Sequence, residues 1–159
     1  MVRSARTKLG TIDEVRQRVE EARRGGARVA LAIGTFDVLQ AGHVRYLSAC
    51  RAEADLLVVG VHGDAAARRV RGSGGPIVCA GDRALLLAAV RVVDQVVVFD
   101  EEEAAALIDR LRPEVFCSCA GSPASTAEAA AARAHGVRIT VIDVAAPDAG
   151  GGLSDGPRR

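Results

Sequence analysis

The sequence is poor in aromatic residues and has no strong charge of either sign. Aromatic residues make up 3% of the 159 residues, and tryptophan is absent. Proteins that bind single-stranded nucleic acids stack bases on aromatic side chains, so this shortage disfavours such a function. The 21 Lys and Arg residues nearly balance the 20 Asp and Glu residues, so the whole chain has no excess charge to attract nucleic acid or an acidic membrane. Neither is an expected partner, and any anion site must be local.

Long apolar runs and metal-binding cysteine motifs are missing as well. The apolar runs have the length of strands, and the basic residues among the first ten are not followed by an apolar stretch, so we expect a cytoplasmic protein. The spacing of the four cysteines does not match a closed zinc site. We therefore expect no metal site built by the protein, and small core side chains at Cys50, Cys79, Cys117 and Cys119.

The remaining pattern is a regular alternation of short apolar strands and helices. The length and the 49% hydrophobic content suit one core, so a single domain over 1–159 is predicted, with flexible ends at 1–10 and 145–159. The expected strands are 28–33, 56–61, 96–99, 115–119 and 137–144, and the expected helices are 11–24, 42–54, 82–90, 125–135 and one between 100 and 113. This order predicts an α/β fold, namely a Rossmann-like, doubly wound, five-stranded parallel sheet with helices on both faces.

A candidate ligand site follows the first expected strand. Open parallel sheets bind ligands at the carboxyl ends of their strands, where the strand order reverses. Gly34 would let the backbone approach a ligand closely, and Thr35 offers a hydroxyl and an amide. The first-turn amides near Gly42 and His43 would point at the same place and suit a phosphate. His43 taken alone could be an exposed helix-start residue, but the whole segment favours a phosphate site.

The segment GTFDVLQAGHVRYL resembles the signature GxFDxxHxGHxxxL of the cytidylyltransferase-like nucleotidyltransferase superfamily. Further similarity, in VHGDAA, RRVRGSGGPI, Asp82-Arg83 and VVVFDE, is closest to the ADP-heptose synthase branch, whose members are sugar-phosphate adenylyltransferases. The resemblance covers roughly 11–144. A competing GxxxxGK[ST] phosphate loop is absent from the sequence.

The resemblance implies a nucleotidyltransferase. Such an enzyme transfers a nucleoside monophosphate from a nucleoside triphosphate, ATP or CTP, to a phosphorylated sugar or alcohol, and it releases pyrophosphate. The reaction needs in-line positioning and charge neutralisation rather than a protein nucleophile. The resemblance also implies Mg²⁺ bound mainly by the triphosphate, and a homodimer for which the apolar helix around 85–89 could supply a surface.

Individual roles follow from the motif positions. Catalytic roles are implied for His43, Gln40 and Arg83, and nucleotide contacts for Gly34, Thr35, Phe36, Gly42, His43 and Arg45. A solvated helix position is the alternative for Arg83. Asp37 is expected to fix its loop through backbone amides, Asp64 to cap a turn, and Ser118 to be a structural or substrate-contacting residue.

Three departures from the family pattern keep other functions open. Gln40 replaces the first histidine of HxGH with a neutral amide. Ser118 to Gly121 lack the family's Lys or Met followed by Gly and Asp, and 153–155 retain little of its Ser-Thr-Thr helix start. One alternative is a catalytically impaired relative that binds nucleotide or another protein. Another is a cytidylyltransferase that acts on glycerol phosphate or a similar alcohol phosphate.

Overall fold

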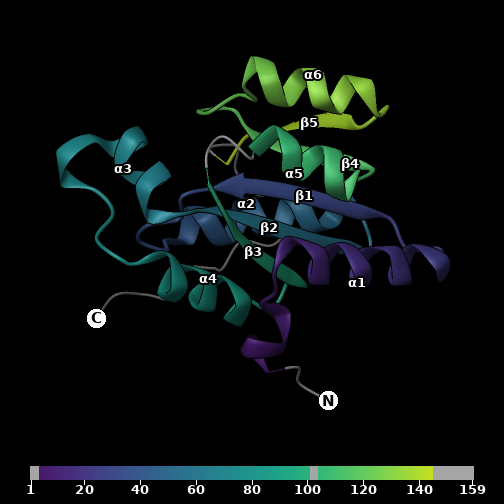
Figure 1. The fold of residues 1–159 in the computed structure, drawn as a ribbon, viewed down its shortest axis with the longest axis horizontal. Helices are drawn as coiled ribbons and strands as arrows, with labels where there is room; N and C mark the ends of the chain where they lie inside the picture. Colours follow the sequence, from purple (N-terminus) through teal and green to yellow (C-terminus); the bar gives the residue numbers. More distant parts are fainter. Residues whose placement is uncertain (1–3, 101–103, 145–159) are drawn as a thin grey trace, which may run out of the picture.

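The computed structural model describes residues 4–100 and 104–144, and its centre is a five-stranded sheet (Figure 1). All neighbouring strands pair in parallel, in the order β3-β2-β1-β4-β5. The strands are β1 (Val29–Gly34), β2 (Leu56–His62), β3 (Gln95–Phe99), β4 (Val115–Cys119) and β5 (Arg138–Ile142). The predicted Rossmann-like α/β fold is confirmed.

Helices cover both faces of this sheet. They are α1 (Ile12–Arg24), α2 (Ala41–Ala52), α3 (Asp64–Arg71), α4 (Ala80–Ala89), α5 (Ala104–Leu111) and α6 (Thr126–Ala134), with 3-10 turns η1 (Ala5–Lys8) and η2 (Gly72–Gly74). Buried side chains of α2 and α4 form one core with the sheet, and those of α1, α5 and α6 form the other. In Figure 1, α3 extends beyond the carboxyl end of β2.

The first strand shows why its sequence is continuously apolar. Val29 and Leu31 pack into the core beneath α1 and α5, whereas Ala30 and Ala32 pack into the core beneath α2. All four side chains are completely buried. A central parallel strand is covered on both faces, so neither of its faces can be polar.

Local capping signals set two helix starts where the sequence places them. Thr11 and Glu14 form a reciprocal capping box at α1, and Ser125 and Glu128 form a second one at α6. The segment after α6 turns at Gly136, whose φ of 66° is in the region that favours glycine.

Three features of the structure were not expected from the sequence. Helix α3 was not expected, because its eight residues adjoin a glycine-rich stretch that predicts a loop. Residues 4–10 belong to an end that we predicted to be flexible, and here η1 packs near α4 and Leu9 pairs with Val96 at the edge of β3. Cys79 is exposed at the start of α4 and is not a core residue. The predicted flexible segment 145–159 and the late family motif at 153–155 lie outside the described residues.

No helix in the described part of the chain is long and apolar enough to cross a membrane. On α4, the helix suggested as a subunit contact, Leu86 is 47% exposed. Homodimer formation and cytoplasmic location stay predictions.

Candidate functional site

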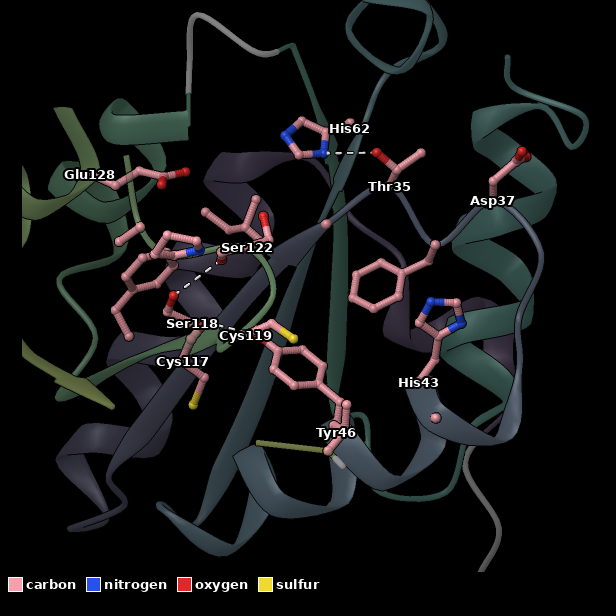
Figure 2. Close-up of a pocket in the computed structure, with 18 of the residues that line it drawn as sticks. Thr35, Asp37, His43, Tyr46, His62, Cys117, Ser118, Cys119, Ser122 and Glu128 are labelled. Carbon is pink, nitrogen blue, oxygen red and sulfur yellow. Dashed lines mark hydrogen bonds between the residues drawn. The ribbon is translucent and has the colours of Figure 1, made fainter. Parts of the chain in front are cut away.

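A cavity of about 720 Å³ opens at the carboxyl edge of the sheet (Figure 2). It lies where β1 adjoins β4, the point at which the strand order reverses, and His62 at the end of β2 also lines it. The cavity brings together most of the residues singled out in the sequence: Gly34, Thr35, Phe36, Asp37, Gln40, Gly42, His43 and Ser118. This is the expected place for a ligand in an open parallel sheet.

The first turn of α2 offers unpartnered backbone donors to the cavity. Among the described residues, the amides of Ala41 and Gly42 donate to no protein acceptor. The turn holds no acidic residue, and Gln40 precedes it as the N-cap. A Cβ added to Gly42 would have no atom within 4 Å, so a ligand can approach the backbone there. Free amides and the positive end of the helix dipole together suit a phosphate.

His43 is held in one tautomer by the backbone beside it. Its Nδ1 accepts a hydrogen bond of 3.0 Å from the Gln40 amide, so the neutral ring carries its proton on Nε2. Burial lowers the pKa of His43 from its ordinary value of 6.5, which favours this neutral form. The Phe36 ring contacts the imidazole edge-on, with 5.5 Å between ring centroids. His43 therefore offers the cavity a neutral Nε2–H donor.

Phe36 has an unusual backbone conformation, and the position of its ring explains why residue 34 is a glycine. Its φ is 49°, in the left-handed region that residues with a side chain rarely occupy. The ring folds back on Gly34, where an added Cβ would lie 2.8 Å from Phe36 Cε2. We expected Gly34 to make room for a ligand, and in the structure it makes room for this ring. Strained residues of this kind cluster at ligand sites.

His62 is a cavity residue that the sequence reasoning missed. Thr35 Oγ1 and His62 Nδ1 lie 3.4 Å apart, and the His62 ring stacks at a tilt on Phe99 with 5.0 Å between centroids. The sequence did contain a signal for His62. This residue ends the second apolar run, and the carboxyl ends of neighbouring parallel strands meet at one edge of the sheet. The cavity therefore holds two imidazoles, from β2 and α2 (Figure 2).

Behind the cavity, buried ionic groups fix the loop that carries Thr35. The Asp37 carboxylate accepts hydrogen bonds from the amides of Ile77 and Val78. Arg83 has a completely buried side chain that donates to Thr35 O at 2.6 Å and to Asp64 Oδ1 at 2.8 Å. The Asp37 carboxylate thus fixes its loop through backbone amides. Asp64, at the start of α3, accepts from Arg83 and from the Ala80 amide rather than capping the turn after β2.

Neither arginine that the resemblance assigned to the site lines the cavity. Arg83 is buried in the layer beneath and is not a solvated helix residue, so it can act on a ligand only through Thr35 and the loop. Arg45 is exposed on α2 two residues after His43, which puts it about 200° around the helix from that ring. Arg45 therefore lies on a different face of α2 from His43 and does not line the cavity.

The wall opposite α2 comes from β4 and the start of α6, and it is rich in hydroxyls. Ser118 is buried with Oγ 3.3 Å from Ser122 O, and Ser122 and Ser125 also line the cavity. Glu128 lines the same wall, and its Oε2 accepts a 2.7 Å hydrogen bond from the Ser125 amide. Tyr46 forms the floor, and its hydroxyl donates to Cys117 O. Only Ser118 was singled out in the sequence.

The electrostatic character of the lining is unusual for a phosphate site. The described residues that line the cavity include two carboxylates, Asp37 and Glu128, and no Lys or Arg. Within that same part of the chain, no group of three or more His, Cys, Asp or Glu side chains could hold a metal ion. Positive potential can therefore come from the α2 amides and from imidazoles, and from a cation that arrives with the ligand.

Comparison with known proteins places this geometry in a family. The cytidylyltransferase-like family model matches residues 31–142, which run from within β1 to the end of β5 and contain every predicted site residue. The chain belongs to the cytidylyltransferase-like family. The bifunctional protein HldE of Syntrophotalea carbinolica is 37% identical to this chain over 139 residues, which are 87% of this chain and 28% of that protein. HldE of Campylobacter curvus is 44% identical over 95 residues, which are 60% of this chain and 20% of that protein.

These matches confirm the superfamily and the branch that the motifs indicated, although the chain spans under a third of the length of these curated relatives. Two solved structures show the same fold. The lipopolysaccharide core biosynthesis protein from Thermoplasma volcanium has a TM-score of 0.64 at 24% identity, covering 74% of this chain and 95% of that one. Pantothenate synthetase from Thermus thermophilus has a TM-score of 0.52 at 18% identity, covering 86% of this chain and 60% of that one.

Proposed function

We propose that this cytidylyltransferase-like chain is a nucleotidyltransferase that binds a nucleoside triphosphate in the cavity between β1 and β4. It transfers the nucleoside monophosphate to a phosphorylated sugar or alcohol and releases pyrophosphate. The observation that carries the proposal is the pair of unpartnered amides at Ala41 and Gly42, in the first turn of α2, beside the Nε2–H donor of His43. Gly42 and His43 both line the cavity. Relatedness to HldE favours a sugar phosphate as the acceptor.

The reaction needs no covalent intermediate with the protein. A phosphate oxygen of the acceptor attacks the α-phosphorus of the triphosphate, and the bond from that phosphorus to the bridging oxygen breaks as pyrophosphate leaves. Negative charge spreads over the phosphoryl oxygens in the transition state. The first-turn amides of α2 and the His43 Nε2–H are fixed donors for that charge, and such donors need no reorganisation during the reaction.

Residues in and behind the cavity fix the loop that leads from β1 into α2. Arg83 holds the Thr35 carbonyl, and Asp37 ties the same loop to the amides of Ile77 and Val78. Mg²⁺ would enter as part of the Mg²⁺–triphosphate complex, where it neutralises charge and orients the phosphates. No acidic cluster among the described residues would hold the ion by itself.

A second candidate is a relative that binds nucleotide with little or no turnover. It is favoured by Gln40 at the position of the first motif histidine and by the absence of Lys and Arg from the described lining. Gln40 can donate a hydrogen bond but cannot carry positive charge. Losing one transition-state donor costs enzymes about 10² to 10³ in rate, so slow turnover would fit either candidate.

The test is pyrophosphate release. The purified chain is incubated with Mg²⁺, each of ATP, CTP, GTP and UTP, and a panel of sugar phosphates and glycerol phosphate. We expect pyrophosphate with at least one pair of substrates, and its loss in His43→Ala. Nucleotide binding without turnover, with turnover gained in Gln40→His, would favour the second candidate. Nucleotide binding that is unchanged in His43→Ala would show that the site is elsewhere.

A further inference from the structure

The two helices that begin at the cavity have opposite chemistry at their N-termini. Helix α2 begins with free amides and no acidic residue in its first turn. Helix α6 begins with a capping box, in which Glu128 accepts from the Ser125 amide and Ser125 Oγ accepts from the Glu128 amide. The α6 end therefore carries its own carboxylate, which cancels the helix dipole and repels a phosphate.

Glu128 retains acceptor capacity after it has capped its helix. The amide of Ser125 uses Oε2, at 2.7 Å, and no hydrogen bond to Oε1 occurs among the described residues. A carboxylate accepts up to about four hydrogen bonds. Figure 2 shows the Glu128 side chain directed from α6 toward the cavity, on the side opposite His43. A carboxylate that faces a cavity and has a spare oxygen is suited to neutral O–H donors.

The serine hydroxyls around Glu128 complete a surface for a neutral polar ligand. Ser118, Ser122 and Ser125 line the same wall. Ser118 Oγ donates its proton to Ser122 O and can accept from a ligand, whereas Ser125 Oγ accepts from the Glu128 amide and can donate to one. The described part of this wall has no cation that would neutralise a phosphate. We propose that Glu128 and the serines around it form a sugar subsite, in which Glu128 Oε1 accepts hydrogen bonds from adjacent hydroxyls of a sugar ring. This inference rests on the proposed function, because it concerns the orientation of the same bound ligand. The phosphates of that ligand lie at the start of α2, and its sugar lies at the start of α6.

Adjacent hydroxyls occur both on the ribose of the nucleotide and on a sugar phosphate acceptor, so the experiment has an arm for each. Binding of the best nucleoside triphosphate is compared calorimetrically with binding of its 2′-deoxy and 3′-deoxy analogues. The second arm compares hexose 1-phosphates with their deoxy counterparts as acceptors. Inorganic tripolyphosphate, which has no sugar, is the third ligand.

The variant is Glu128→Gln, because glutamine keeps the capping box while it removes the charge. Glu14→Gln is the matched control, since Glu14 caps α1 in the same way with Thr11 and does not line the cavity. We expect the preference for the hydroxylated ligand over its deoxy analogue to fall about 10-fold or more in Glu128→Gln and to stay unchanged in Glu14→Gln. Tripolyphosphate should bind Glu128→Gln as tightly as wild type, or more tightly, because a repelling charge is gone.

Loss of preference in the nucleotide arm identifies ribose as the occupant, and loss in the acceptor arm identifies the acceptor sugar. Undiminished preferences in both arms would overturn the subsite. A parallel loss of tripolyphosphate binding would assign Glu128 a purely structural role and would also overturn it. A wild-type chain that binds tripolyphosphate but shows no preference for hydroxylated ligands would refute the subsite alone. A wild-type chain that binds none of these ligands would refute the proposed function as well.

Discussion

Replacing Gly42 with alanine should increase the stability of the fold and weaken ligand binding. Gly42 is the second residue of α2, and its ideal Cβ has no atom within 4 Å. Its φ is not in the positive range, so alanine fits without backbone strain. Gly81 is the second residue of α4, is equally uncrowded, and does not line the cavity. Gly81→Ala is therefore a control at the same helical position.

The expected gain in stability comes from the unfolded chain. Glycine has more freedom to lose on folding than alanine, and this substitution at a compatible site contributes about 0.4–1 kcal/mol. For a chain of this size, that raises the melting temperature by about 1 to 4 °C. Both variants should show the rise in the absence of ligand.

The expected loss in binding comes from the added methyl group. Helical Cβ atoms tilt toward the N-terminus, so the methyl at Gly42 would stand beside the free amides of the first turn. A phosphate oxygen held away from one of these amides loses a charge-assisted hydrogen bond of about 1.5–3 kcal/mol. The dissociation constant for a nucleoside triphosphate or tripolyphosphate should rise about 10- to 100-fold in Gly42→Ala and stay unchanged in Gly81→Ala.

Thermal unfolding with and without tripolyphosphate measures both effects in one assay. A ligand that binds only the folded state raises the melting temperature according to its affinity. Gly42→Ala should melt higher than wild type without ligand and gain little when the ligand is added. If Gly42→Ala gained as much from the ligand as Gly81→Ala, the phosphate site would not be at the start of α2.

Two further predictions concern the layer behind the cavity and the pH dependence of folding. Arg83→Met removes the buried partner of Asp64. Because Asp64 is one third exposed, we expect a loss of stability near the lower end for a broken buried pair, about 3 kcal/mol, which lowers the melting temperature by about 6 to 12 °C. A decrease below about 2 °C in thermal unfolding would contradict the structural role of Arg83. Burial lowers the pKa of His43 in the folded state. Below its ordinary pKa of 6.5, the unfolded chain therefore binds a proton at this residue more readily than the folded chain does. The stability of the fold should decrease as the pH falls below 6.5. Urea denaturation at about pH 7.5 and about pH 5 should show wild type losing more stability than His43→Gln, and an equal loss in the two proteins would mean that the folded-state pKa of His43 is not lowered.

Features with local causes could be predicted from the sequence. The capping boxes at Thr11 and Ser125 depend on residues three positions apart, and the apolar run of β1 requires burial on both faces wherever the strand lies. The start of α2 beside the β1–β4 junction follows from the same strand and helix order. Each of these inferences uses neighbouring residues and the rules of parallel sheets.

Features with distant partners could not be predicted. Arg83 hydrogen-bonds to Thr35, 48 residues earlier in the chain, and so is a buried positioning residue rather than a phosphate-facing cation. His62 meets Thr35 across 27 residues. Glu128 was hidden by its own capping role, because S-x-x-E at a helix start is fully explained without a ligand. What the sequence lacked in each case was the identity of the tertiary neighbour.

The described lining of the cavity can stabilise the negative charge of a phosphate mainly through hydrogen-bond donors. Arg83 holds the Thr35 carbonyl, and Arg45 does not line the cavity, so the described lining would present the proposed triphosphate with amides and imidazoles rather than guanidinium groups. The neutral tautomer of His43 donates a hydrogen bond without adding a full charge. Such a wall stabilises negative charge through oriented hydrogen-bond donors rather than through full positive charges. It therefore favours a phosphate that Mg²⁺ has already partly neutralised over a phosphate without Mg²⁺. The Glu128 carboxylate on the opposite wall would repel phosphate, so under the proposed function the two walls together favour one orientation of a nucleotide over its reverse.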